Sequence, residues 1–484
     1  MLMYIYRFLL CALLFAGFGT GRAASPNVIV IFADDQGYGD LGCFGSPNIE
    51  TPNIDRMAAE GIRFTSFYAA PFCGPSRAQL MTGSYHARVS HSFNPSPGSK
   101  NGLHPNEVTI AEVLKTAGYR SMHIGKWHLG DEEPLLPTNQ GFDEYFGLPF
   151  SNDMWPYHPK MPPRENEDAL MTEIRERAAY TGFAGQGGYY DVANGGGFPE
   201  PLPLMRETEV IELNPDQTQL TERYTEAAVN FIKSNRDGPF LLYLAHAMPH
   251  VPLFVSERFR GKSSRGLYGD VMMEIDWSCG EIMKELKRLG IEKDTLIIYT
   301  SDNGPWLQYG IDGGSAGPLR AGKGSVWEGG VRVPGIFHWP GRIPGGRRTD
   351  AIAGTLDILP TVAHLAGAQM PRDRVHDGVN LWPLLAGETT AGPRDYFHYF
   401  AGARPGAPAN LRGVRDARWK LLTRVGQNGG LRAAELYDLN ADPSERFNRL
   451  EAHPEVAKRL LREATNFRAA LREQQRPFGQ IGLN

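Results

Sequence analysis

The chain has 484 residues, and its 50 Lys and Arg side chains against 54 Asp and Glu side chains give a formal net charge of −4. Nothing in so small an imbalance suggests a nucleic-acid-binding surface, which requires a clustered basic excess. With 41% hydrophobic residues, the chain is long enough to form one large core and a smaller second domain.

The first residues have the pattern of a secretory signal peptide. Arg7 precedes an apolar run from Phe8 to Phe18, and small residues lead to a cleavage position after Ala23. This run is too short to span a bilayer, and no later stretch approaches a membrane span. We therefore expect residues 1–23 to be removed and the mature protein to be exported. The sequence has no Asn-X-Ser/Thr acceptor, which favours a bacterial protein over a glycosylated eukaryotic one.

Short apolar runs alternate with helical patterns along most of the mature chain. The runs predict five buried strands, at residues 27–33, 121–125, 240–246, 295–301 and 333–339. Apolar residues at helical spacing predict helices at 53–60, 108–117, 220–233 and 270–289, and the Pro and Gly residues of 71–83 predict a turn that opens another helix. This alternation predicts an α/β fold with a doubly wound, largely parallel central sheet, to which we assign residues 24–385.

Two regions depart from this alternation. Between Trp155 and Leu204 the chain is rich in Gly, Pro and Tyr and has one helical pattern, at 169–179. This insertion is either a specificity element near the site or a surface excursion without function. Beyond Leu385, short segments predict antiparallel strands, and residues 454–474 predict a closing amphipathic helix. We expect residues 386–484 to form a smaller α+β domain.

Polar or charged residues follow four of the predicted strands. They are Asp34 and Asp35 after the first, Lys126 and His128 after the second, His250 after the third, and Asp302 and Asn303 after the fourth. Each one alone could be a turn or cap residue. Because the C-terminal ends of parallel strands lie at one edge of a sheet, we expect these side chains to meet there.

These residues offer two kinds of chemistry. The oxygens of Asp34, Asp35, Asp302 and Asn303 suit Ca²⁺ or Mg²⁺, and a divalent cation allows neighbouring carboxylates to stay ionised together. Several cationic or ionisable groups could converge on the same edge, namely Arg77, Lys126, His128, His250 and Lys323. A metal ion with several such donors favours an oxyanion substrate, either a phosphate or a sulfate ester.

Three cysteines remain once Cys11 is lost with the signal peptide: Cys43, Cys73 and Cys279. An odd number in an oxidising compartment leaves at least one of them unpaired. Cys73 is either a buried filler or half of a disulfide, or it is a nucleophile assisted by the start of a helix and by Arg77.

The residues around Cys73 match a known signature. Residues 73–77 (CGPSR), followed by Thr82 and Gly83, fit the pattern C-x-P-S-R-x-x-x-x-T-G. A second signature at 118–128 (GYRSMHIGKWH) accompanies it, as do the segments 32–45, 51–69, 249–252, 301–305 and 319–335. From residue 27 to residue 341, and more faintly beyond, the chain resembles the sulfatase family, in particular its arylsulfatase A branch.

The resemblance implies a specific chemistry for Cys73. In this family a formylglycine-generating enzyme oxidises the motif cysteine to Cα-formylglycine (3-oxoalanine) during export. The hydrated aldehyde carries two hydroxyls on one carbon. One hydroxyl attacks the sulfur and releases the substrate alcohol, and the other expels sulfate and restores the aldehyde.

The resemblance also implies roles for the other site residues. One Ca²⁺ per active site would be bound by Asp34, Asp35, Asp302, Asn303 and the converted side chain of Cys73. Arg77 and Lys126 would hold that side chain, and His128 would be the base in sulfate release. His250 and Lys323 would bind the ester and protonate the leaving oxygen. Ser151 would be a further sulfate contact.

We therefore expect a calcium-dependent, arylsulfatase-type sulfuric ester hydrolase that acts on a sulfated small molecule or glycan, most plausibly a sulfated carbohydrate. A related phosphomonoesterase, or a phosphonate or phosphodiester hydrolase, is the first alternative, and a catalytically silent glycan-binding protein is the second. The chain lacks the many disulfides and the glycan acceptors of the animal lysosomal members. We accordingly expect it in a bacterial periplasm or outside the cell rather than in a lysosome.

Overall fold

The computed structural model describes residues 25–154, 201–408 and 410–482. The predicted signal peptide and residues 155–200 of the predicted insertion, including its helical pattern, lie outside this part of the chain.

A mixed 11-stranded sheet forms the centre of the fold, with the strand order β11-β2-β10-β9-β1-β8-β4-β5-β6-β7 and with β12 paired to β2. Its strands are β1 (Asn27–Ala33), β2 (Ile62–Tyr68), β4 (Arg120–Gly125), β5 (Glu144–Gly147), β6 (Pro203–Arg206), β7 (Glu209–Leu213), β8 (Phe240–Ala245), β9 (Thr295–Ser301), β10 (Arg332–His338), β11 (Arg347–Thr349) and β12 (Ala353–Gly354). The run β9-β1-β8-β4-β5 is parallel, whereas β10, β6 and β7 pair antiparallel with their neighbours. The predicted α/β fold with a central sheet is confirmed.

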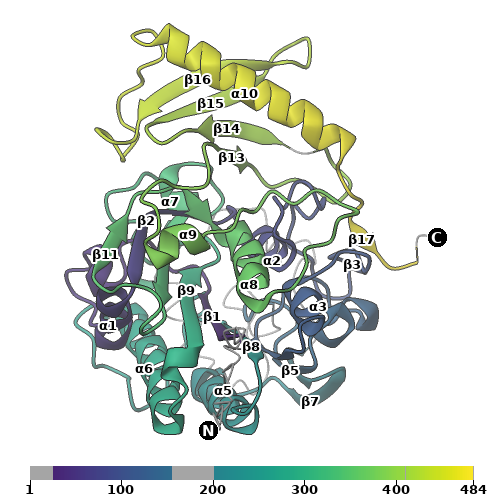
Figure 1. The fold of residues 1–484 in the computed structure, drawn as a ribbon, viewed down its shortest axis with the longest axis vertical. Coiled ribbons are helices and arrows are strands. Elements are labelled where there is room, and N and C mark those ends of the chain that lie inside the picture. Colours follow the sequence, from purple (N-terminus) through teal and green to yellow (C-terminus); the bar gives the residue numbers. More distant parts are fainter. Residues whose placement is uncertain (1–24, 155–200, 409, 483–484) are drawn as a thin grey trace, which may run out of the picture.

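Helices cover both faces of this sheet (Figure 1). One face packs against α1 (Pro52–Glu60), α5 (Leu220–Ser234) and α6 (Leu267–Leu289). The other face packs against α2 (Cys73–Thr82), α3 (Ile110–Lys115), α8 (Ile358–Ala366) and α9 (Trp382–Ala386). Among the residues that the structure describes, no helix is both long enough and apolar enough to cross a membrane.

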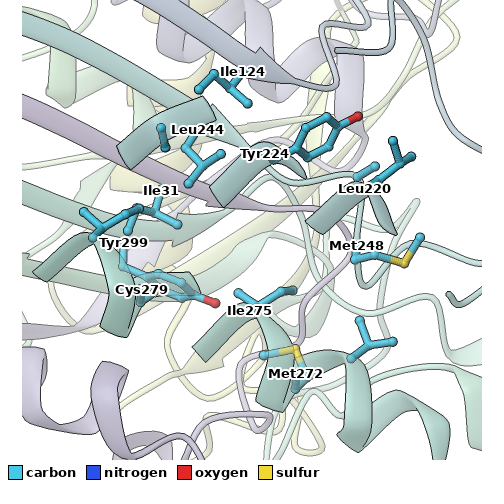
Figure 2. Packing of buried hydrophobic residues seen from close by; sticks show 14 of the residues in the cluster. Ile31, Ile124, Leu220, Tyr224, Leu244, Met248, Met272, Ile275, Cys279 and Tyr299 are labelled. Carbon is cyan, nitrogen blue, oxygen red and sulfur yellow. The ribbon is translucent and has the colours of Figure 1, made fainter. Parts of the chain in front are cut away.

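The two helical layers explain why the central strands are apolar throughout. Successive side chains of a strand point to opposite faces, and in β1 every residue is buried. Ile29 and Ile31 belong to the cluster formed with α6, where Ile275 and Cys279 lie close to the sheet (Figure 2). Val28 and Val30 belong to the cluster on the opposite face. Full burial of one such side chain contributes about 1.5–3 kcal/mol, which fixes the strand on which the site is built.

A second, four-stranded antiparallel sheet lies beyond the central one. It contains β13 (Phe397–Phe400), β14 (Leu411–Arg415), β15 (Trp419–Val425) and β16 (Leu431–Asp438), in that order. Helix α10 (Pro454–Glu473) runs across this sheet (Figure 1), and its Leu460 and Ala464 pack with Val414 and Leu421. The same cluster includes Tyr68 of β2 and Val331 of α7 (Glu328–Val331), so the two sheets share an apolar interface. A two-residue pairing of β3 (Asn101–Gly102) with β17 (Gly479–Gln480) completes the described strands.

Candidate active site

The predicted site residues meet at the C-terminal ends of the neighbouring parallel strands β9, β1, β8 and β4. Backbone bonds continue the strand pairing into the loops that carry them. Asp34 N donates to Met248 O at 3.1 Å, Asp302 N to Ala33 O at 3.1 Å, and Lys126 N to Ala245 O at 2.9 Å. These bonds fix the positions at which the loops leave the sheet, and therefore the backbone that carries Asp34, Lys126 and Asp302.

Cys73 is the first residue of α2 and is almost completely buried. Its thiol donates to Asp34 Oδ1 at 3.4 Å, and the next amide, of Gly74, donates to Asn94 Oδ1 at 2.9 Å. Burial, together with Asp302 and Asp34, raises the pKa of the thiol well above its usual value. All three cysteines of the described residues are free, so the disulfide alternative for Cys73 is wrong.

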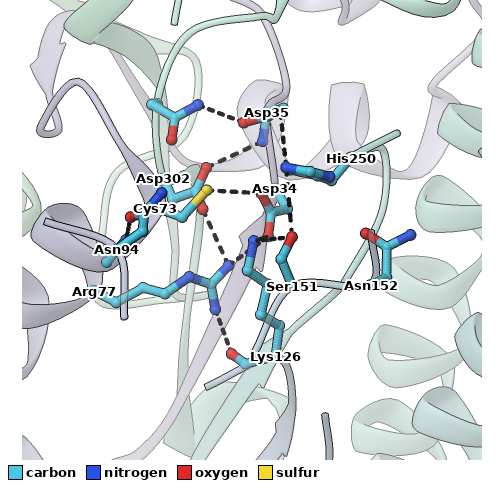
Figure 3. Close-up of polar contacts among 12 residues, drawn as sticks. Asp34, Asp35, Cys73, Arg77, Asn94, Lys126, Ser151, Asn152, His250 and Asp302 are labelled. Carbon is cyan, nitrogen blue, oxygen red and sulfur yellow. Dashed lines mark hydrogen bonds and ion pairs between the residues drawn. The ribbon is translucent and has the colours of Figure 1, made fainter. Parts of the chain in front are cut away.

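Arg77 and Lys126 bind the carboxylates beside Cys73 (Figure 3). Arg77 forms ion pairs with Asp34 at 3.0 Å and Asp302 at 3.1 Å, and Lys126 Nζ lies 2.5 Å from Asp34. Arg77 also donates to the carbonyl oxygen of Lys126. Burial opposes ionisation of Asp34, but Lys126 and Arg77 together hold its pKa far below the usual range. Asp34 is therefore a permanent negative charge in a site without bulk water.

Lys323, His250 and Ser151 form the other side of this buried cluster. Lys323 Nζ lies 2.8 Å from Asp35, and His250 Nε2 lies 3.5 Å from the same carboxylate. Ser151 Oγ accepts from Lys126 Nζ at 3.2 Å and lies 3.5 Å from His250 Nε2 (Figure 3). The structure thus places Ser151 between Lys126 and His250.

His128 is also buried, and in the described part of the chain neither of its ring nitrogens has a hydrogen-bond partner. Burial, with Lys126 and Arg77 nearby, lowers its pKa well below the usual value, so the ring is neutral. His128 and Asp35 both adopt left-handed backbone conformations, with φ of 60° and 64°. Such conformations are rare for residues other than glycine and concentrate at functional sites.

The donor set fits a hard divalent cation. Ligand atoms of Asp34, Asp35, Cys73 and His250 lie within 4.8 Å of one another. Asn303 donates through Nδ2 to Asp35 Oδ1 at 2.6 Å, whereas its Oδ1 is buried and has no partner among the described residues. Burial and the neighbouring charge of Asp34 raise the pKa of Asp302 to about 7, because carboxylates crowded together disfavour each other's ionisation. Carboxylate and amide oxygens are the ligands of Ca²⁺ and Mg²⁺.

Two residues at the site were missed by the sequence analysis. Trp306 contacts both proposed leaving-group residues, since Lys323 Nζ lies 4.3 Å from its ring centroid and the His250 ring lies 5.4 Å away. Its place directly after the segment 301–305 was an available signal. Asn94, which accepts from the amide after Cys73, lies in a Pro- and Ser-rich stretch with no motif to mark it.

Comparisons with known proteins identify the family of this chain. The sulfatase family model matches residues 26–368, and the model described as N-sulphoglucosamine sulphohydrolase, C-terminal, matches residues 322–470. Human arylsulfatase A is 38% identical over 474 residues, covering 91% of this chain and 87% of its own. Among solved structures, PsFucS1 sulfatase from Pseudoalteromonas sp. gives a TM-score of 0.79 at 27% identity, with 94% of this chain and 92% of that chain covered. Ps i-CgsB gives 0.76 at 31% identity, with 94% and 95% covered.

The fold and the relatives define a sulfuric ester hydrolase. The chain belongs to the sulfatase family. Hydrolysis of sulfate esters is therefore the activity of this family, and the phosphatase and phosphonate hydrolase alternatives are not supported.

Proposed function

We propose that this sulfatase hydrolyses sulfate esters of carbohydrates, through a formylglycine made from Cys73 and with one Ca²⁺ in the active site. The observation that carries the proposal is the convergence of Cys73 with three carboxylates and three cations in one buried cluster. Residues separated by up to 289 positions, from Asp34 to Lys323, contribute to this cluster, and each has a use in sulfate ester hydrolysis. A binding protein without catalysis would not require that set.

The hydrated aldehyde made from Cys73 would supply the two hydroxyls that the reaction needs, one as the nucleophile and one whose loss of a proton allows sulfate to leave. Arg77 and Lys126 hold the neighbouring carboxylates so that position 73 stays in one orientation. His128 is the base in sulfate release, since neither of its ring nitrogens has a hydrogen-bond partner among the described residues and one is free to accept a proton.

Asp34, Asp35, Asp302 and Asn303 would hold the calcium ion together with the converted residue 73. When bound, Ca²⁺ supplies positive charge that orients a sulfate oxygen and favours an ionised hydroxyl. The three carboxylates and the cations Arg77, Lys126 and Lys323 cancel in formal charge. A divalent ion therefore leaves the pocket net positive, which favours an anionic ester and the charge of its transition state.

Ser151, Lys126, His250 and Lys323 form the substrate side of the pocket. Ser151 and Lys126 can donate to sulfate oxygens from one side. His250 and Lys323 lie together beside Asp35, where they can bind the bridging oxygen and protonate it as the alcohol leaves.

Two further points complete the proposal. Ps i-CgsB was solved in complex with k-i-k-neocarrahexaose, which supports a carbohydrate ester as the substrate class here. We also infer that residues 1–23 direct export, that the enzyme works in the periplasm or outside the cell, and that a formylglycine-generating enzyme matures it. Residues 24–385 form the catalytic domain, and residues 386–484 form a smaller domain.

Peptide mass spectrometry of the segment that holds Cys73, combined with kinetics on sulfated oligosaccharides, tests the proposal. We expect the peptide to have the mass of the aldehyde or its hydrate and the intact enzyme to release inorganic sulfate. Rates on matched aryl sulfate and aryl phosphate should favour the sulfate. A fully active enzyme in which Cys73 remains a thiol would overturn the mechanism.

A further inference from the structure

We propose that the C-terminal sheet positions Lys323 in the active site, and that Lys420 and Glu445 are the positioning residues through which it acts. The inference rests on the proposed function, because it takes Lys323 as a group that binds the ester. It goes further by giving the second sheet a part in the reaction.

Lys323 lies in a loop, residues 318–328, which has little regular structure of its own. On the active-site side, Lys323 N donates to Pro305 O and Gly324 N donates to Pro71 O, both at 2.9 Å. These two bonds connect the loop to the segment after Asp302 and to the turn before Cys73. Any displacement of the loop would therefore reach three parts of the site together.

Two residues of the C-terminal sheet region hold the opposite side of this loop: Lys420 of β15, and Glu445, which comes after β16. Lys420 Nζ donates to Val326 O at 2.8 Å, and Glu445 Oε2 accepts from Glu328 N at 2.7 Å. Arg320 donates to Glu445 O at 2.8 Å. Three hydrogen bonds thus join the C-terminal sheet to residues 318–328, and each of them uses one backbone group.

The charges at this junction are completely buried. Lys420 Nζ lies 3.0 Å from Glu328 and 2.8 Å from Glu445, and the side chains of all three have no exposed surface. Tyr68 and Tyr399 also donate to Glu328, at 2.7 and 2.9 Å. A buried ion pair contributes little net stability compared with an apolar packing, so its presence is better explained by the single geometry that it imposes.

The backbone of Glu445 supports the same conclusion. Its φ is 52°, in the left-handed region that glutamate rarely adopts, yet the residue is fully buried. This conformation accompanies an arrangement in which its carbonyl oxygen faces Arg320 while its carboxylate faces Glu328 N and Lys420. Residues held in this way mark places where a fixed geometry is needed.

The test combines hydrogen exchange with kinetics on the calcium-loaded, mature enzyme. In the double variant Lys420→Met/Glu445→Gln, which removes the cation and one anion together, we expect faster amide exchange across residues 318–328 and no change in β8. We expect kcat/KM for an aryl sulfate to fall by about 100-fold, the effect of a small displacement of a site residue. The KM should rise in parallel, since Lys323 binds the ester. Arg418→Ala, which removes a largely exposed side chain that pairs with Asp438 on the same sheet, is the matched control and should behave as wild type.

The Lys323→Ala background separates this inference from the proposed function. If Lys420 and Glu445 act through Lys323, their substitution should cause little further loss in that background. An equally large loss there, or unchanged exchange across residues 318–328, would overturn the inference. Full activity of Lys323→Ala itself would instead refute the role given to Lys323, with exchange still deciding whether the sheet holds the loop. If the double variant fails to fold, Arg320→Met, at an exposed position, should show the same changes at smaller size, and their absence would count against the inference.

Discussion

The thiol of Cys73 lies 3.4 Å from Asp34 Oδ1, although the two residues come from different elements and are 39 positions apart. Asp34 in turn contacts Arg77 and Lys126, so the thiol adjoins a carboxylate that is already fixed by two cations. Because the proposed nucleophile and the proposed metal ligands belong to one cluster, removing either should stop the reaction, but with different signatures.

Cys73→Ala should lower kcat by at least about 10⁴-fold, since the nucleophile cannot be formed. The change removes a sulfur atom from the start of a helix and leaves Arg77 with both of its carboxylate partners, so the melting temperature should change little. Hydrolysis of para-nitrophenyl sulfate and thermal unfolding followed by circular dichroism measure the two effects. Cys279→Ala, in the core beside β1, should show the reverse: normal activity and a loss of about 1–2 kcal/mol in stability. An active Cys73→Ala enzyme would exclude formylglycine chemistry.

Asp302→Ala should weaken calcium binding and activity together. Excess Ca²⁺ should restore only part of the activity, because the substitution also removes one of the two ion-pair partners of Arg77. Calorimetric titration of Ca²⁺ into the metal-free enzyme and rates at rising Ca²⁺ concentration measure this. Asp373→Asn, an exposed carboxylate, is the control and should bind Ca²⁺ as wild type does. Unchanged activity after exhaustive chelation would contradict the ligand set.

His250→Gln should affect poor leaving groups more than good ones. If His250 helps to protonate the departing oxygen, hydrolysis of an alkyl or sugar sulfate should slow by about 10²–10⁴-fold, and that of an aryl sulfate with a good leaving group much less. A plot of log kcat against the pKa of the leaving alcohol should become steeper. His364→Gln, on the exposed side of α8, should leave the slope unchanged. Equal losses for all leaving groups would remove His250 from the proton transfer.

The stability of the fold should fall on acidification, and His91 should contribute. Burial lowers the pKa of His91 from 6.5 to about 4, so the folded chain keeps this ring neutral while the unfolded chain binds a proton. The associated stability is fully present above pH 6.5 and is lost as the pH falls towards 4. In urea unfolding, the free-energy difference between about pH 7 and pH 5 should be about 2 kcal/mol smaller for His91→Gln than for wild type. The same difference in both proteins would show that His91 does not titrate in this way.

Gly304→Ala should distort the active site by displacing the backbone next to Asn303. A Cβ at this position would lie 1.8 Å from the carbonyl oxygen of Gly329, so the segment after Asn303 must move. We expect kcat/KM to fall by about 100-fold and the melting temperature to drop. Gly238→Ala, where a Cβ would meet no atom within 4 Å, is the matched control and should have no effect on activity. Wild-type kinetics in Gly304→Ala would mean that the backbone here tolerates displacement.

The sequence predicted the central strands, which are covered by helices on both faces. Other strands and helices were predicted less well. β1 and β9 have the predicted bounds because burial on both faces requires an uninterrupted apolar run. β2, with the sequence IRFTSFY, was not predicted as a strand, since its polar residues interrupt the run although most of them are buried in the fold. The pattern could not give the antiparallel direction of β10, because direction depends on how distant strands pair. α8 was missed because it contains Pro360, which its first turn accommodates.

The site was largely predictable because its residues follow strand ends and lie in motifs. The contacts that connect the C-terminal sheet to the site could not be predicted. In the sequence, Lys420 is a single charged residue in a short predicted strand, and such a side chain is expected to be exposed to solvent. The structure buries it completely against Glu328, a residue 92 positions away. Contacts of this kind depend on how the second sheet packs on the first, which no local pattern records.

The burial of Cys73 has a consequence for the order of folding and modification. Only 1% of this residue is exposed, and the first helical turn and the ion pairs of Arg77 close around it. An enzyme that oxidises this thiol, as proposed above, has to reach it, and the folded chain gives no access. Under that proposal we infer that the oxidation takes place on the nascent or unfolded chain, so that a molecule which folds first would remain inactive for as long as it stays folded.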